Sequence, residues 1–114
     1  MSGITTHVLD TARGRPAAGV PVLLERREAA GGWRELGRGA TDAEGRVRSL
    51  LPAGSALEAG VYRLTFDTAA YSRTQGTAGF YPEVRISFEV RNPAEHHHLP
   101  LLLSPFGYST YRGS

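Results

Sequence analysis

The stretch Val84-Arg85-Ile86-Ser87-Phe88-Glu89-Val90 alternates apolar and polar side chains along its whole length. A period of two is typical of a β-strand with one buried face and one solvated face. The segment Val61–Phe66 repeats this alternation. Two half-buried strands are therefore predicted, and they indicate an all-β fold.

Six further segments have strand character and are separated by turns rich in Gly, Pro and Asp. They are Ile4–Thr11, Gly19–Arg27, Arg34–Ala40, Arg46–Leu50, His96–Leu103 and Gly107–Arg112. Eight short strands at roughly ten-residue spacing predict an eight-stranded antiparallel β-sandwich. One short helix is expected over Thr68–Gln75, beginning at Asp67 or Thr68 and ending at Gly76.

The composition of the chain is that of an ordinary globular domain. With 114 residues, 40% of them hydrophobic, a single domain spanning 1–114 is expected. No apolar run is long enough to cross a bilayer. The 13 basic residues, all arginines, are interleaved with 11 acidic ones, which argues against a nucleic-acid partner. Without a recognisable leader the expected location is the cytoplasm, or the periplasm if a leader has been removed.

The C-terminal residues Tyr111-Arg112-Gly113-Ser114 concentrate polar chemistry after the apolar run Leu99–Leu103. They bring together a phenol, a guanidinium, a hydroxyl and a free carboxylate. A terminus that only packs has no need of these groups, because most chain ends are small, polar and dispensable. We interpret the tail as part of a site.

Three of the four histidines lie on one predicted strand, and the chain has no cysteine. Alternation puts His96 and His98 on one face and His97 on the other, with the leucines. The His96/His98 pair, together with His7, is a conceivable zinc site. No acidic residue stands at a supporting spacing, and Glu95 falls on the opposite face, so structural or solvated histidines are the stronger interpretation.

His7 interrupts the apolar pattern of Ile4–Leu9, and Arg46 follows a turn over Asp42–Gly45. A titratable residue within a strand is either functional or a core histidine bonded to backbone. Arg46 taken alone is an exposed turn residue. No nucleophile elbow, paired carboxylates or phosphate-binding loop competes with these residues.

Three motifs together resemble one family. They are Ile4-Thr5-Thr6-His7-Val8-Leu9-Asp10 with Gly14-Arg15-Pro16-Ala17, then Thr41–Arg46, then His96–Ser114 with its terminal Tyr-Arg-Gly-Ser. Through these motifs the chain resembles the 5-hydroxyisourate hydrolases, the transthyretin-related proteins of purine catabolism. The resemblance covers the whole chain. True transthyretins share the sandwich but lack this ending and the histidines. His97 departs from the tyrosine of many members.

The resemblance implies a transthyretin-like sandwich and a homotetramer with sites at its subunit interface. It implies hydrolysis of 5-hydroxyisourate to 2-oxo-4-hydroxy-4-carboxy-5-ureidoimidazoline, without metal or other cofactor. His7 and His98 are then the candidates for the base that activates water, and which of them acts stays open. Arg46 stabilises the oxyanion. The residues implied to bind substrate or complete the site are His7, Arg46, Tyr111, Arg112, Gly113 and Ser114.

Two other functions fit the same fold. A transthyretin-like carrier would bind a small molecule in the channel without converting it, and its channel is expected to be more apolar. A metal-binding or adhesion module would use His96–His98. The histidines and Arg46 favour catalysis over both.

Overall fold

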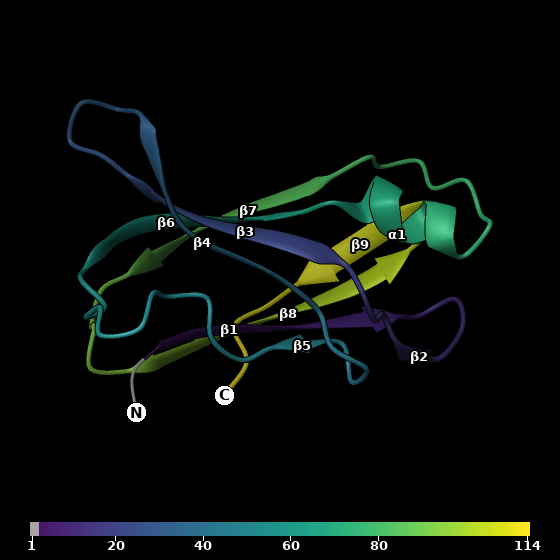
Figure 1. The fold of residues 1–114 in the computed structure, drawn as a ribbon, viewed down its shortest axis with the longest axis horizontal. Helices are drawn as coiled ribbons and strands as arrows, with labels where there is room; N and C mark the ends of the chain where they lie inside the picture. Colours follow the sequence, from purple (N-terminus) through teal and green to yellow (C-terminus); the bar gives the residue numbers. More distant parts are fainter. Residues whose placement is uncertain (1–2) are drawn as a thin grey trace.

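A computed structural model of the chain describes residues 3–114, which form two β-sheets packed face to face with one short helix at one end (Figure 1). The predicted all-β sandwich is confirmed. Met1 and Ser2, on which the expected absence of a leader partly rests, lie outside the described residues. Within residues 3–114 we find no helix of the length and apolarity that a membrane crossing requires.

The first sheet is built around two neighbouring strands, β1 (Gly3–Asp10) and β8 (His96–Ser104). Its order is β2–β1–β8–β9, with β2 at Arg15–Pro16 and β9 at Gly107–Thr110. The two-residue strand β5 (Arg46–Val47) also pairs with β1, beside its middle. The edge of β1 is thus shared by β5 and β2.

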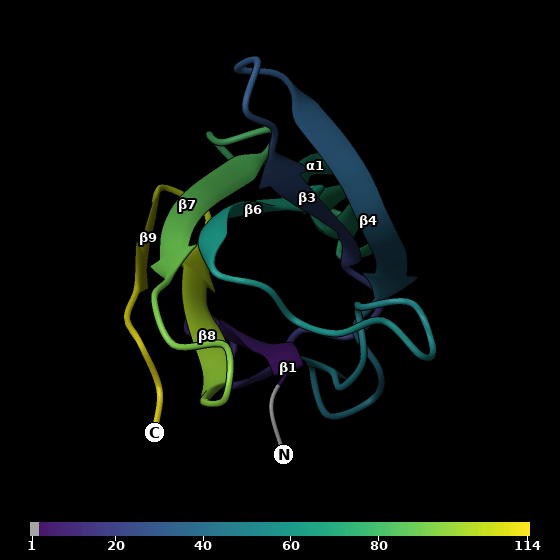
Figure 2. The same ribbon diagram turned by 90° about the vertical axis from the view of Figure 1, so that its left-hand side faces the viewer.

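The second sheet has the order β4–β3–β6–β7 and is antiparallel throughout. Figure 2 shows it arching over β1 and β8 when the sandwich is seen end-on. Its strands are β3 (Pro21–Arg27), β4 (Trp33–Ala40), β6 (Gly60–Phe66) and β7 (Val84–Val90).

The core lies between the sheets and follows the alternation read from the sequence. In β6 the residues Tyr62, Leu64 and Phe66 are buried, and in β8 the leucines 99, 101 and 103 are buried with His97. In β1 the even-numbered residues face the core and the odd-numbered ones face outward. The outer face of the first sheet therefore carries Thr5, His7, His96 and His98.

The helix α1 (Thr68–Thr74) is one residue shorter than predicted. Asp67 is its N-cap, and its carboxylate accepts a hydrogen bond from the backbone N–H of Ala70 at 3.0 Å. The chain leaves the helix through Gly76, whose φ of +67° is readily adopted only by glycine.

Three features of the sheets differ from the prediction. Residues 3–114 form nine strands, because β2 forms where only a turn was expected. The strand β5 is shorter than the predicted Arg46–Leu50. β1 and β8 are parallel rather than antiparallel. This pairing is possible because the whole second sheet lies between them in the sequence, which gives the chain room to return in the same direction.

The turn before β5 depends on Gly45. Its φ is +78°, its carbonyl accepts the N–H of Val8 at 2.7 Å, and a Cβ there would collide with the carbonyl oxygen of that residue. Asp42 completes the turn by accepting the N–H groups of Glu44 and Arg46 at 2.9 and 3.0 Å. These contacts fix β5 against the middle of β1.

We predict that Gly45→Ala lowers the free energy of unfolding by about 2–4 kcal/mol, from left-handed strain plus a lost backbone hydrogen bond. Gly14→Ala is the matched control, because Gly14 has a similar φ of +70° but open space around it. It should cost about 1 kcal/mol. Denaturant unfolding of both variants measures the difference, and equal losses would show that the contact with Val8 is unimportant.

Candidate active site

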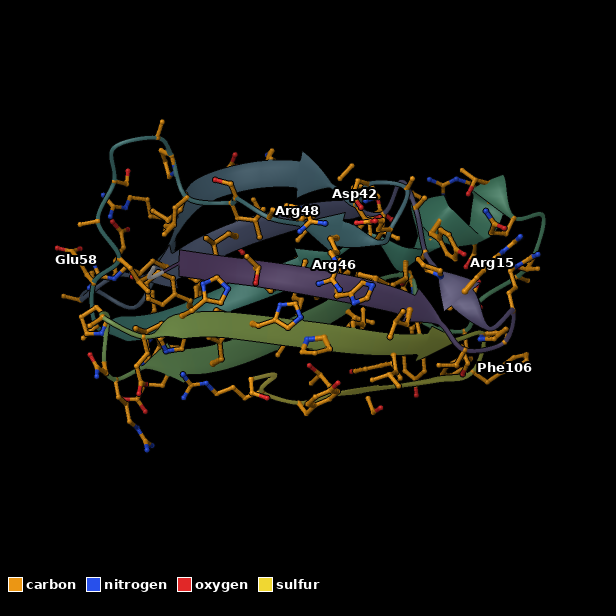
Figure 3. All side chains as sticks on the ribbon, turned by 90° about the horizontal axis from the view of Figure 1, so that it is seen from below. Arg15, Asp42, Arg46, Arg48, Glu58 and Phe106 are labelled. Atoms are coloured by element: carbon orange, nitrogen blue, oxygen red, sulfur yellow. The ribbon has the colours of Figure 1, made fainter. Side chains whose placement is uncertain are left out.

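The outer face of the first sheet brings together residues from three distant parts of the chain. Parallel pairing sets Thr5 opposite His98, and antiparallel pairing sets His7 opposite Arg46. Figure 3 views this face, with Arg46 and Arg48 above the strands β1 and β8. The last residue, Ser114, reaches the same face.

A pocket of about 450 Å³ opens among these side chains. Its lining is mostly polar and basic, and consists of Thr5, Thr6, Arg46, Val47, Arg48, His96, His98 and Ser114. Three predicted site residues, Arg46, His98 and Ser114, thus line one cavity. A cavity of this size matches a small polar ring compound.

His98 is the half-buried imidazole of this pocket. Its Nδ1 lies 2.8 Å from the hydroxyl of Thr5. Burial lowers the pKa of His98, and the nearby charge of Arg46 lowers it further, as do His7 and His96. A neutral ring is thereby favoured at neutral pH, and a neutral ring is the form that can accept a proton.

His7 lies on the outer face and does not break the core pattern of its strand, contrary to the sequence-based interpretation. Alternate residues of β1 face outward, and His7 is one of them. Its Nε2 donates to the carbonyl oxygen of Glu44 at 2.8 Å. The neutral ring therefore carries its lone pair on Nδ1. His7 is paired with Arg46, which lines the pocket, but His7 itself is not among the lining residues.

Arg46 and Arg48 differ in how their charges are used. Arg48 pairs with Glu44 at 2.7 Å and approaches Asp42 at 3.9 Å. None of the ion pairs within residues 3–114 uses the guanidinium of Arg46. Its charge is therefore available to an anionic group in the pocket.

The C-terminal tail is held against His98. The N–H of Gly113 donates to the carbonyl oxygen of His98 at 2.8 Å, which closes a single antiparallel bridge. A Cβ at Gly113 would stand 2.7 Å from Cδ2 of that ring. Only glycine lets the backbone come so near, and the contact brings Ser114 to the pocket.

Tyr111 and Arg112 do not line this pocket. They border a second groove of about 320 Å³ beside β7, together with His97 and Leu99. Arg112 donates to Glu95 and to the carbonyl oxygen of His96, both at 3.3 Å. Arg112 thus pairs with a carboxylate of its own chain.

The zinc interpretation finds no support in the geometry. No group of three or more His, Cys, Asp or Glu side chains in residues 3–114 is arranged to hold a metal ion. His96 Nε2 and His98 Nδ1 both lie 2.8 Å from one threonine hydroxyl instead. His97 is buried in the core, as alternation predicts, and burial lowers its pKa.

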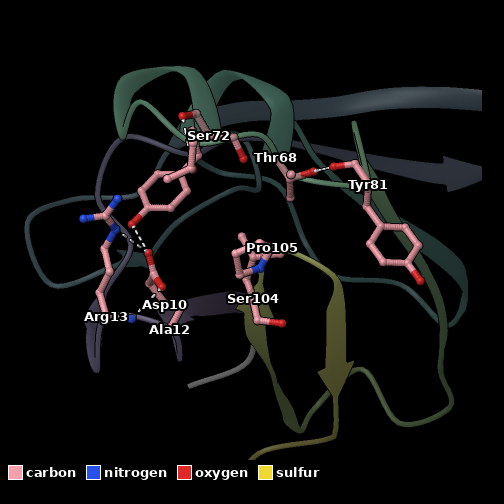
Figure 4. Close-up of a pocket in the computed structure, with 12 residues that line it drawn as sticks. Asp10, Ala12, Arg13, Thr68, Ser72, Tyr81, Ser104 and Pro105 are labelled. Carbon is pink, nitrogen blue, oxygen red and sulfur yellow. Dashed lines mark hydrogen bonds and ion pairs between the residues drawn. The ribbon is translucent and has the colours of Figure 1, made fainter.

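A smaller cavity of about 130 Å³ lies at the helix end of the sandwich (Figure 4). Its buried carboxylate, Asp10, accepts the hydroxyl of Tyr71 at 2.7 Å and approaches the Arg13 Nε at 3.4 Å. Burial, followed by this hydrogen bond, raises the pKa of Tyr71 to about 12. The polar groups satisfy one another, which is typical of a structural network.

Four residues that line the pocket were not singled out from the sequence as site residues, namely Thr5, Thr6, Val47 and Arg48. Alternation puts Thr5 on the same face as His7, but its proximity to His98 depends on the register of β1 with β8. That register cannot be predicted from local sequence patterns, because the two strands are far apart in the chain. Arg48 follows Arg46 by two positions and shares its side of the chain, which is a signal available in the sequence.

Comparisons with known proteins show the family to which the chain is similar. A family model described as the HIUase/Transthyretin family matches residues 4–113. The 5-hydroxyisourate hydrolase of Caulobacter vibrioides is 48% identical over 118 residues, covering 100% of each chain. The solved structure of Klebsiella pneumoniae 5-hydroxyisourate hydrolase has a TM-score of 0.85 and 37% identity, covering 99% of this chain and 100% of the other.

A carrier shares the fold. Sea bream transthyretin, solved in complex with thyroxine, has a TM-score of 0.90 and 36% identity, covering 96% of this chain and 93% of the other. The arrangement of sheets alone therefore does not separate a hydrolase from a carrier.

We predict that the imidazole of His98 titrates below the ordinary histidine value and that Arg46→Gln raises its pKa, because one of the causes of the shift is removed. Arg48→Gln is the control, since Arg48 is not among those causes. NMR titration of the His98 ring protons measures both. Because the folded-state pKa is depressed, the stability tied to neutral His98 is present above the ordinary value and is lost as the pH falls through the folded pKa. If Arg46→Gln and Arg48→Gln changed the pKa of His98 equally, Arg46 would not be the specific cause of the shift.

Proposed function

The chain belongs to the HIUase/transthyretin family, and we propose that it hydrolyses 5-hydroxyisourate in the pocket lined by Arg46, His98 and Ser114. The observation that carries the proposal is a half-buried imidazole with a lowered pKa beside a guanidinium that forms no ion pair within residues 3–114. Such a pair supplies a base and an anion-stabilising group at one place.

The reaction is the addition of water to a ring carbonyl followed by cleavage of the adjoining C–N bond. The six-membered ring of the substrate contains an activated cyclic amide. Water loses one proton as its oxygen attacks the carbonyl carbon, and the ring nitrogen gains one as it leaves. The product carries a new carboxylate and a ureido group, so the protein has only to move one proton and stabilise one oxyanion.

His98 is the base in this proposal. It lines the pocket, and burial lowers its pKa, which favours the neutral ring. General base catalysis by a well-placed imidazole is typically worth about 10²- to 10⁴-fold in rate. His7 is a less suitable base because it is not among the residues that line the pocket. We assign His7 the role of orienting substrate beside Arg46.

Arg46 stabilises the charge that develops on the carbonyl oxygen. Its planar guanidinium presents paired donors that suit the edge of a urate-like ring. Ser114 contributes a hydroxyl that can hold the attacking water. Its own carboxylate argues against Ser114 as a nucleophile, because two negative charges would then develop side by side.

We extend the proposal to a homotetramer with its sites at the subunit interface. Among residues 3–114, four large hydrophobic side chains are exposed in the isolated chain, namely Phe80, Phe106, Tyr108 and Tyr111. Exposed aromatic groups of this kind mark interaction surfaces. Tyr111 and Arg112 then contribute to the site through the assembly, where a second subunit supplies a further wall.

A carrier function is the alternative from another class. The likeness to sea bream transthyretin, solved with thyroxine, is the observation in its favour. The pocket residues argue against it, because half of the eight lining residues are arginine or histidine. A carrier for an aromatic hormone needs a more apolar lining.

We predict that purified protein accelerates the ultraviolet decay of 5-hydroxyisourate formed in situ by urate oxidase. His98→Ala and Arg46→Ala should each lower kcat/KM by about 10²-fold or more, since each removes a group that acts in the transition state. Arg38→Ala, an exposed arginine on β4, is the control for loss of positive charge. Circular dichroism and sedimentation should show the variants folded and assembled.

Decay no faster than the spontaneous reaction would overturn the proposed function. Wild-type turnover in either variant would remove that residue from the mechanism. Tight binding of thyroxine-like ligands by a protein without hydrolase activity would favour the carrier.

We further predict that deleting 111–114 abolishes hydrolysis while the sandwich stays folded, because these residues follow the last strand, β9. Gly113→Ala tests the tail without shortening it. The added methyl group presses on the His98 ring and should displace either the ring or Ser114. Steady-state kinetics and denaturant unfolding measure both effects, and an active truncated protein would leave the tail a packing role.

A further inference from the structure

On the pocket face, the hydroxyl of Thr5 lies within hydrogen-bond distance of both His96 and His98. The Oγ1 of Thr5 lies 2.8 Å from Nε2 of His96 and 2.8 Å from Nδ1 of His98. A hydroxyl has a single proton to donate, and both ring nitrogens of a neutral imidazole cannot be donors. The two rings are therefore coupled through Thr5.

We propose that Thr5 sets the tautomer of His98 and that His96 decides which way the Thr5 hydroxyl points, so that both are positioning residues for the reaction. The inference rests on the proposed function, with His98 as the base. Neither residue touches the reacting atoms in this scheme. Each acts on where the proton of the His98 ring resides.

The productive arrangement has one direction of hydrogen bonding. Neutral His96 keeps its proton on Nδ1 and accepts the Thr5 hydroxyl at Nε2. The Thr5 oxygen then accepts the Nδ1–H of His98, and the lone pair of His98 is left on Nε2. That atom is bonded to Cδ2, the ring carbon beside Gly113, so the basic nitrogen lies on the side of the tail and Ser114.

The opposite direction of hydrogen bonding, from His96 through Thr5 to His98, removes the lone pair by which His98 acts as base. When His96 is protonated, its Nε2–H donates to the Thr5 oxygen. In the arrangement that we propose, the hydroxyl then donates its own proton to Nδ1 of His98, and the proton of the neutral His98 ring moves to Nε2. No lone pair remains toward the tail to take a proton from water. Protonation of His96 thus switches off His98 without any movement of the backbone.

The charges around His96 come from several elements. Those that face it from β8, β5 and the tail are Glu95, His98, Arg46, Arg48, Arg112 and the carboxylate of Ser114. The test therefore counts the protons that inactivate the enzyme, because their number depends on the coupling and not on the midpoint of the pH profile.

Kinetics test the coupling. In the wild type, protonation of either His96 or His98 removes the base, so the acid limb of log kcat against pH should steepen from a slope of one toward two. His96→Gln offers an amide oxygen near the position of Nε2 that accepts the Thr5 hydroxyl but does not titrate. It should show a slope of one, whatever its turnover at neutral pH.

Substitution of Thr5 tests the hydroxyl itself. Thr5→Val keeps the shape of the side chain and should lower kcat by about 10- to 100-fold with little change in KM, because the base is lost from most molecules. Thr5→Ser should restore kcat. A slope of two in His96→Gln, or no rescue by Thr5→Ser, would overturn the inference.

A measurement on the resting protein separates this inference from the proposed function. Nitrogen chemical shifts of the His98 ring report its tautomer without any substrate. We expect the Nδ1–H form in the wild type, the Nε2–H form in Thr5→Val, and a change from the first to the second as His96 is protonated. Thr6→Val is the matched control, since the Thr6 hydroxyl donates to the Leu99 carbonyl instead.

The outcomes are distinguishable. Failure to hydrolyse 5-hydroxyisourate, with the expected tautomers present, would overturn the proposed function and leave the coupling of Thr5 with the two histidines intact. An active enzyme whose His98 tautomer is the same in the wild type and Thr5→Val would overturn the inference and leave the function intact.

Discussion

The parallel pairing of β1 with β8 is the constraint on which the site depends. Eight residue pairs run from Gly3 opposite His96 to Asp10 opposite Leu103. A shift of this register by one residue would turn the outward set of β8 inward. The buried leucines of β8 prevent that shift, because they would lose their place in the core. Burial of the inner face thus fixes the chemistry of the outer face.

The same constraint explains why small backbone details matter at the site. β5 reaches His7 only because the Asp42–Gly45 turn bends tightly enough to bond with Val8. The tail reaches His98 only because Gly113 has no side chain. Each contact adds one group to a face already defined by β1 and β8. Gly45 and Gly113 thereby position the guanidinium of Arg46 and the terminal carboxylate of Ser114.

Much of the fold could be predicted from the sequence, because alternation is a local signal. The eight expected strand segments contain strands, the helix has Asp67 as its N-cap, and the faces of His96, His97 and His98 are as alternation requires. The direction of β8 relative to β1 was wrong, because alternation is the same in either direction. The interruption at His7 was also misread, since its strand alternates without a break.

The site was less predictable for the same physical reason. Of the residues that the resemblance named, Arg46, His98 and Ser114 line one pocket, whereas Tyr111 and Arg112 border the neighbouring groove. Thr5 was missed because its partner His98 is 93 residues away. A carrier and a hydrolase can share the sandwich, and the sheets of this chain would serve either. What separates the two functions is the set of outward side chains. There, burial keeps an imidazole neutral, and a threonine hydroxyl can set the position of its proton, which makes the pocket suited to moving protons rather than only to holding a ligand.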